Sequence, residues 1–126
     1  MKSKLVYTGI RVKDMDTSIK FYTEVMGMKL KGKNSIESTM GEVASLVGED
    51  GGHEIELNYY KEESKYYEPY ENGQELDHLA FWVEDLDKFL AETKKLGHSA
   101  VLEVKSPTSK WAYIQDPNGI YIEIFT

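Results

Sequence analysis

RVKDMDTSIKFY, residues 11–22, and WVEDLDKFLAET, residues 82–93, are the two stretches that decide the fold. In each, an aspartate suited to cap a helix follows a strand-like segment and precedes an apolar stripe at helical spacing. A second pair of matches, IEL at residues 55–57 and IEI at residues 122–124, follows in the same order. The chain is therefore expected to contain one supersecondary unit twice. The residues matched across the first pair are Val12, Asp14 and Asp16 with Val83, Asp85 and Asp87, 71 positions later.

Each half predicts a strand, a helix and three further strands. In the first half, Asp14 or Asp16 caps a helix whose apolar stripe is Ile19, Tyr22 and Met26, and Gly27 ends it. In the second half the helix covers residues 85–96 and ends at Gly97. The fold class is α+β: two β-α-β-β-β modules, residues 1–70 and 74–126, form one domain with a curved mixed sheet and helices on its outside.

Strand alternation separates two kinds of face. One face is aliphatic and is expected to pack under the helix of its module. The other carries aromatic side chains together with Glu56, His78 and Glu123. Burying those carboxylates unpaired costs several kcal/mol each, so a half-open cup with a cation at its base is favoured. The repeat places Tyr7 in the first module where His78 stands in the second.

Composition excludes several classes of function. The 126 residues carry a net charge of -7 and show no basic stripe, which argues against nucleic acid as a partner. With no cysteine, a metal must be held by His, Asp, Glu or Tyr. No signal peptide and no apolar run of membrane-spanning length is found, so a cytoplasmic protein without a membrane partner is expected.

Four stretches make the chain similar to the vicinal oxygen chelate superfamily, closest to its glyoxalase I (lactoylglutathione lyase) and bleomycin resistance group. They are IRVKDMDTSIKFYTEVMGMKL, IELNYY, DHLAFWVEDLDKFLAETKKLG and YIQDPNGIYIEIF, which together span nearly the whole chain in order. The resemblance implies a glyoxalase-like, metal-dependent lyase or isomerase acting on a small α-carbonyl or thiol-adduct substrate. The alternative is a metal-free binding protein that sequesters a small compound.

The resemblance also implies a site. Glu56, His78 and Glu123 match metal ligands of the family, and Tyr7 stands where the family has a histidine. The ion would be divalent: Ni, Zn, Co, Mn or Fe. Glu123 is the first candidate for the catalytic base and Glu56 the second. Substrate binding falls to Arg11, Tyr7, Asn58, Tyr60 and Trp82, with Tyr60 replacing an asparagine of the family.

Three arrangements stay open at Tyr7, because a neutral phenol is a poor metal ligand unless the cation removes its proton. The metal is held by three protein ligands plus water, or Tyr7 is a weak fourth ligand, or the cup holds a ligand without metal. Relatives of this length imply a homodimer in which Tyr7 and Glu56 come from one subunit and His78 and Glu123 from the other. Arg11 could instead pair with Glu54 or Glu123. The tyrosine-rich loop after residue 60 is expected to pack on its own module, and His53 to point away from Glu56.

Overall fold

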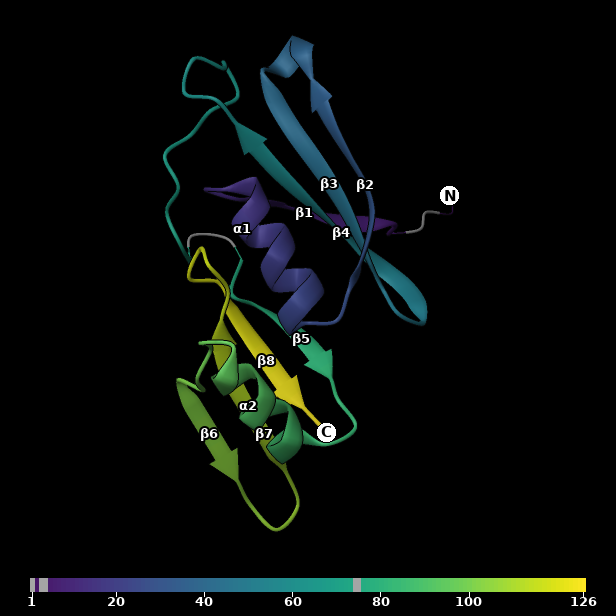
Figure 1. Ribbon diagram of the computed structural model, residues 1–126, viewed down its shortest axis with the longest axis vertical. Coiled ribbons are helices and arrows are strands. Elements are labelled where there is room, and N and C mark those ends of the chain that lie inside the picture. The colour runs from purple at the N-terminus through teal and green to yellow at the C-terminus, as the bar shows by residue number, and fades with distance from the viewer. Residues whose placement is uncertain (1, 3–4, 74–75) are drawn as a thin grey trace. The chain divides into compact units, whose positions relative to one another are not determined.

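The computed structural model describes residues 2, 5–73 and 76–126 of the chain. It contains two compact units, residues 1–70 and 71–126, and each holds one four-stranded sheet with its own helix (Figure 1). Both sheets are mixed, since the first and last strands of each unit pair in parallel and the others pair antiparallel. The α+β class predicted from the repeat is confirmed. We refer to the two units as module 1 and module 2.

Module 1 has the strand order β1-β4-β3-β2. A π-helical segment, Phe21–Val25, continues its helix, and a 3₁₀ turn, Glu37–Thr39, separates its second and third strands. The bounds are β1 (Tyr7–Arg11), α1 (Met15–Lys20), β2 (Lys29–Ile36), β3 (Gly41–Gly48) and β4 (Gly51–Tyr60).

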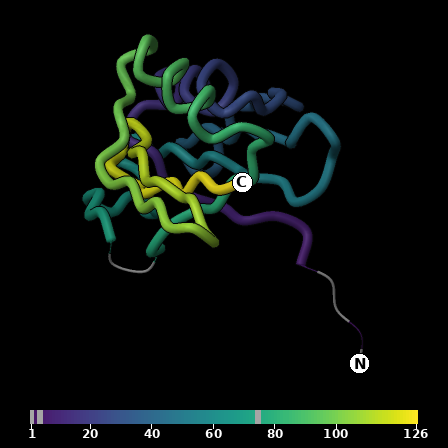
Figure 2. The backbone as a smooth tube through the Cα atoms, turned by 90° about the horizontal axis from the view of Figure 1, so that it is seen from below, coloured from purple at the N-terminus to yellow at the C-terminus, as the bar shows by residue number. Residues whose placement is uncertain are grey.

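Module 2 repeats the arrangement with the order β5-β8-β7-β6. Helix α2 lies over one face of this sheet, and the C-terminal strand, yellow in both views, runs among the green strands of the module (Figure 1; Figure 2). The bounds are β5 (His78–Trp82), α2 (Leu86–Lys95), β6 (Leu102–Lys105), β7 (Lys110–Gln115) and β8 (Tyr121–Phe125).

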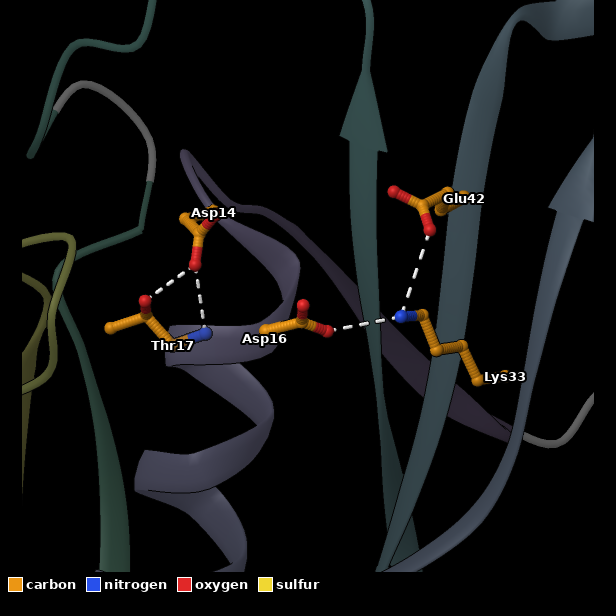
Figure 3. A network of polar contacts seen from close by, with 5 residues as sticks. All are labelled: Asp14, Asp16, Thr17, Lys33 and Glu42. Carbon is orange, nitrogen blue, oxygen red and sulfur yellow. Dashed lines mark hydrogen bonds and ion pairs between the residues drawn. The ribbon is translucent and has the colours of Figure 1, made fainter.

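Both helices begin where the aspartates predict. The Asp14 carboxylate accepts hydrogen bonds from the Thr17 backbone N–H, at 2.9 Å, and from the Thr17 hydroxyl (Figure 3). These hydrogen bonds hold the pKa of Asp14 below its ordinary value. Asp85 caps α2 in the same way, accepting from the Lys88 backbone N–H at 3.0 Å. Capping by Asp14 rather than Asp16 leaves the Asp16 side chain free for another contact.

That contact ties the start of α1 to its sheet. The Lys33 ammonium on β2 lies 3.0 Å from the Asp16 carboxylate and 3.7 Å from the Glu42 carboxylate of β3 (Figure 3). The hydrogen bond to Asp16 is the main cause that raises the pKa of Lys33. Exposed ion pairs of this kind contribute little to the free energy of unfolding. Their main effect here is to position the start of α1 beside β2 and β3.

The aliphatic faces form the cores, as the alternation predicts. In module 2 four side chains on one face of β7 and β8 have no exposed surface, Ala112, Ile114, Ile122 and Ile124. Leu86, Leu90 and Thr93 of α2 are buried as well. The stripe predicted for the first helix was wrong in part, because Tyr22 is buried but Ile19 and Met26 are only half-buried. The π-helical segment explains the position of Met26: its N–H bonds the carbonyl of Phe21, five residues back, which rotates Met26 away from α-helical spacing. Its buried face is Met15, Ser18, Phe21 and Tyr22.

Candidate metal centre and its aromatic surroundings

His78, the first residue of the edge strand β5, and Glu123 on the neighbouring strand β8 form a pair on one face of the module 2 sheet. The imidazole Nε2 lies 3.1 Å from a carboxylate oxygen of Glu123. The two residues are not direct strand neighbours: His78 is opposite Tyr121, and Glu123 is opposite Ala80. The pair is therefore a diagonal contact between β5 and β8. Both side chains are about a third exposed, 34% for His78 and 27% for Glu123, so a small ligand can reach them.

A second carboxylate contacts the other ring nitrogen. Asp77 places a carboxylate oxygen 2.7 Å from His78 Nδ1. When Nδ1 donates its proton to Asp77, Nε2 of the neutral ring presents a lone pair toward Glu123. Metal-binding histidines are commonly held this way, with the non-ligating nitrogen donating to a carboxylate.

Aromatic rings surround the pair. The Tyr113 ring lies 5.7 Å from the His78 ring, edge to face, and makes similar contacts with Trp111 at 5.4 Å and Tyr121 at 5.7 Å. Tyr113 is also the direct cross-strand neighbour of Glu123. Partial burial raises the pKa of the Tyr113 phenol above its ordinary value, and the Glu123 and Asp77 carboxylates add to the shift. No hydrogen bond to the Tyr113 hydroxyl is found among the described residues.

Module 1 presents the matching face without the imidazole. Tyr7 is opposite Glu54, two residues before Glu56, just as His78 is opposite the residue two before Glu123. Tyr7 and Glu56 therefore occupy the same diagonal in module 1 that His78 and Glu123 occupy in module 2. Between them Gly9, opposite Glu56, has no side chain to cover the carboxylate.

The predicted substrate residues Arg11, Asn58 and Tyr60 lie on this face of module 1. Asn58 is opposite Arg11 and donates its amide N–H to the Glu56 carbonyl at 3.2 Å. The Arg11 guanidinium lies 5.1 Å from the centre of the Tyr60 ring and donates to the Tyr66 carbonyl at 3.0 Å. Within the described part of module 1, Arg11 forms no ion pair with Glu54, whose carboxylate instead bonds Lys31 at 2.6 Å.

The loop after β4 packs on its own module, as predicted. Besides its carbonyl contact with Arg11, Tyr66 packs against Tyr60 with ring centres 6.1 Å apart and ring planes inclined by 43°. The Lys13 ammonium lies 5.0 Å from the centre of the Tyr70 ring, and Lys65 lies 5.0 Å from that of Tyr66. His53 contacts the Thr8 hydroxyl at 2.8 Å on the face opposite Glu56, so it is no part of the candidate centre.

The chemistry of the pair fits a metal ion. Two donor atoms bound to one cation at about 2.1 Å, with bonds at right angles, lie about 3.0 Å apart, close to the observed 3.1 Å. Within either module, the described residues include no three His, Asp or Glu side chains already gathered as a metal site. His78 and Glu123 are thus two donors placed side by side on module 2.

Two residues of this surface were missed by reasoning from sequence. Asp77 was missed because it lies just before β5, where strand alternation does not yet apply. The available signal was an acidic residue directly before the candidate histidine. Tyr113 could have been found by pairing the last two strands around the Asp116–Gly119 turn, which places it beside Glu123.

The predicted substrate residue Trp82 lies on the same face of the module 2 sheet as His78 and is 65% exposed.

Comparisons with known proteins agree with one another. The family model described as Glyoxalase/Bleomycin resistance protein/Dioxygenase superfamily matches residues 4–124. The chain is 35% identical over 127 residues to a probable lactoylglutathione lyase of Vibrio parahaemolyticus, covering 96% of this chain and 88% of that protein. It is 34% identical over 125 residues to the lactoylglutathione lyase of Haemophilus influenzae, covering 95% and 90%. The solved structure of the trypanothione-dependent glyoxalase I of Leishmania major superposes with a TM-score of 0.80 at 29% identity, covering 99% of this chain and 87% of that one.

Proposed function

Because the chain belongs to the glyoxalase/bleomycin resistance protein/dioxygenase superfamily, we propose that it is a glyoxalase-type lyase acting on an adduct of a thiol and a small α-carbonyl compound. The observation that carries this proposal is the His78–Glu123 pair, held 3.1 Å apart beside a solvent-accessible aromatic face. Relatives about 35% identical over nearly the whole chain are named lactoylglutathione lyase, which supports the same reaction class. As with any fold, the reaction is argued from the site, not from the family alone.

The proposed ligands of one divalent cation are Glu56, His78 and Glu123. When bound, the cation supplies Lewis-acid chemistry: it withdraws electron density from substrate oxygen and makes the adjacent C–H more acidic. Imidazole and carboxylate donors suit Ni, Zn, Co, Mn or Fe. Three protein ligands leave positions open to substrate, as catalytic metal sites require.

The chain's own residues would move the proton. Glu123 removes the proton from the carbon next to the carbonyl, and Glu56 is the second candidate for this role. Arg11, Asn58 and Tyr60 bind the thiol-bearing part of the substrate on the module 1 face. Tyr7 and Trp82 flank the reacting part. Among the described residues the Arg11 guanidinium donates to the Tyr66 carbonyl. Its further N–H groups can bind an anionic group of the substrate.

The decisive experiment measures metal and activity together. Protein purified without chelator is analysed for metal, then assayed with hemithioacetals of several thiols after addition of each candidate ion. We expect a bound divalent ion, a higher melting temperature with metal, and thioester formation that His78→Ala abolishes. Absence of activity with every thiol and ion would refute the lyase.

A second function has its own supporting observation. Trp82, Tyr121 and Phe125 are all exposed on the sheet face that holds Glu123. Such a face suits sequestration of a flat aromatic compound without metal. Quenching of tryptophan fluorescence by aromatic ligands, equal with and without metal, would support binding over catalysis, since Trp82 and Trp111 are the two tryptophans of the chain.

We further propose a homodimer with shared sites, in which Tyr7 and Glu56 of one subunit meet His78 and Glu123 of the other. Twofold dimers are the commonest oligomer, and each module alone offers only half of the ligand set. Light scattering tests the dimer, and a mixing experiment tests the sharing. Inactive Glu56→Ala and Glu123→Ala proteins, mixed and re-associated, should regain about a quarter of the activity, because half of the dimers are mixed and each has one intact site. Sites confined to one chain would regain none.

No helix formed by the described residues is long and apolar enough to span a membrane.

A further inference from the structure

Both ring nitrogens of His78 face carboxylate oxygens. Nδ1 lies 2.7 Å from Asp77 Oδ1, and Nε2 lies 3.1 Å from Glu123 Oε2. A neutral imidazole carries one N–H, so it can donate to one of these acceptors only. The carboxylate that accepts this hydrogen bond therefore decides which ring nitrogen presents a lone pair.

The geometry favours Asp77 as the acceptor of the hydrogen bond that His78 donates. Its contact is shorter by 0.4 Å than the contact to Glu123, as the two distances of 2.7 and 3.1 Å show. Asp77 precedes the first residue of β5, so its side chain is not directed to the opposite face by strand alternation. Asp77 is nearly fully exposed, with 94% of its side chain accessible, so burial does not force it into this contact.

The ring has a further support. Tyr113 meets the His78 ring at 5.7 Å with the planes 76° apart, an edge contact that limits tilting of the imidazole. Tyr113 restrains the plane of the ring, whereas Asp77 determines which nitrogen points to Glu123 with a free lone pair.

We propose that Asp77 is a positioning residue that keeps the proton of His78 on Nδ1, so that Nε2 faces Glu123 unprotonated. Its consequence for metal binding rests on the proposed function: Nε2 is then ready to bind a cation together with Glu123. Without Asp77 the neutral ring donates from Nε2 to Glu123, and that hydrogen bond occupies both of the atoms that a cation needs.

Nuclear magnetic resonance of the full chain tests the proton position directly, without any assay of activity. Long-range ¹H–¹⁵N correlations identify the protonated nitrogen of each imidazole at alkaline pH, where the ring is neutral. The chain has three histidines, so His78 is readily assigned by comparison with His78→Ala. We expect Nδ1–H in the parent protein and Nε2–H in Asp77→Ala.

Two further variants separate the hydrogen bond from general charge. Asp77→Glu keeps an acceptor of the same charge and should restore Nδ1–H in a large part of the population. Glu84→Ala removes an exposed carboxylate just beyond the other end of β5 and should leave the tautomer unchanged. Melting curves of all variants should coincide, because Asp77 and Glu84 are exposed.

Zinc alone then tests the consequence. Loss of an outer carboxylate partner weakens metal affinity by about 10- to 100-fold, so we expect a loss of that size for Asp77→Ala and none for Glu84→Ala. A parent protein with the proton on Nε2, or an Asp77→Ala protein that keeps it on Nδ1, overturns the positioning role. A tautomer change with unaltered zinc affinity overturns its link to metal binding. A parent protein that binds no zinc yet shows the expected tautomers overturns the proposed metal centre, while the role of Asp77 toward His78 stands.

Discussion

The turn before β8 offers the sharpest test of what holds Glu123 in place. Asp116 is 4% exposed, and its Oδ1 accepts hydrogen bonds of 2.8 Å from the backbone N–H groups of both Asn118 and Ile120. Asn118 and Ile120 are also buried. Asp116→Ala leaves two buried donors without this acceptor, at about 1–3 kcal/mol each, so unfolding should become easier by roughly 2–6 kcal/mol. That is a large part of the roughly 5–15 kcal/mol that stabilises a typical domain.

Urea denaturation followed by circular dichroism measures the effect. With a slope of about 2 kcal/mol per molar urea, the midpoint should fall by roughly 1–3 M. Asp116→Asn is the matched control, because its amide oxygen can still accept both backbone hydrogen bonds. It loses the 3.0 Å hydrogen bond that the Asn118 side chain donates to Oδ2. If Asp116→Ala is as stable as Asp116→Asn, the reasoning that the carboxylate organises this turn is refuted.

Three other predictions concern the site and the helix starts. Tyr7→His should raise metal affinity and any lyase activity, because a neutral imidazole offers a lone pair that a phenol offers only after losing its proton. Calorimetry with zinc measures the affinity. If a variant that melts normally shows no gain in zinc affinity, Tyr7 does not face the metal. Asp14→Ala should lower the melting temperature and Asp14→Asn much less, since Asn still caps helices; equal losses would contradict the capping role. The Lys105 hydrogen bond is the main cause that lowers the pKa of Asp87 below 3.8. The pair therefore stabilises the protein above that ordinary value and is lost as the pH falls through the lower folded-state pKa. Melting temperatures between pH 5 and 2 should accordingly fall less steeply for Asp87→Asn than for the parent, and a slope as steep as that of the parent would exclude this linkage.

The repeat made most of the fold predictable, because its signals are local. Asp14 and Asp85 cap their helices, and Gly27 and Gly97 follow them with φ angles of 72° and 92°. Gly51 and Gly52 likewise have positive φ at the β3–β4 turn. Period-2 alternation then separates buried Ile122 and Ile124 from half-buried Glu123. Each of these features depends on a few neighbouring residues, which a sequence shows directly.

What escaped prediction depends on contacts between distant segments or on small departures from regular geometry. A carboxylate partner was the alternative to substrate binding by Arg11, but the guanidinium donates to the loop carbonyl of Tyr66, 55 residues away. The half-burial of Met26 follows from a π-helical segment, which has no clear signal in composition. Tyr113 became a neighbour of His78 only through the register of β7 with β8 and of β8 with β5.

The two faces of each sheet have a consequence for the history of such proteins. In module 2, folding depends on Ala112, Ile114, Ile122 and Ile124, all without exposed surface, whereas His78 and Glu123 lie on the other face. Under the proposed function, substitutions at the second set change the chemistry while the hydrophobic core stays intact. Duplication adds a spare copy of each position, so one module can retain imidazole at the start of its first strand while the other drifts to tyrosine. A lineage built this way can exchange reactions without passing through unfolded ancestors, which agrees with a superfamily whose description joins glyoxalases, resistance proteins and dioxygenases.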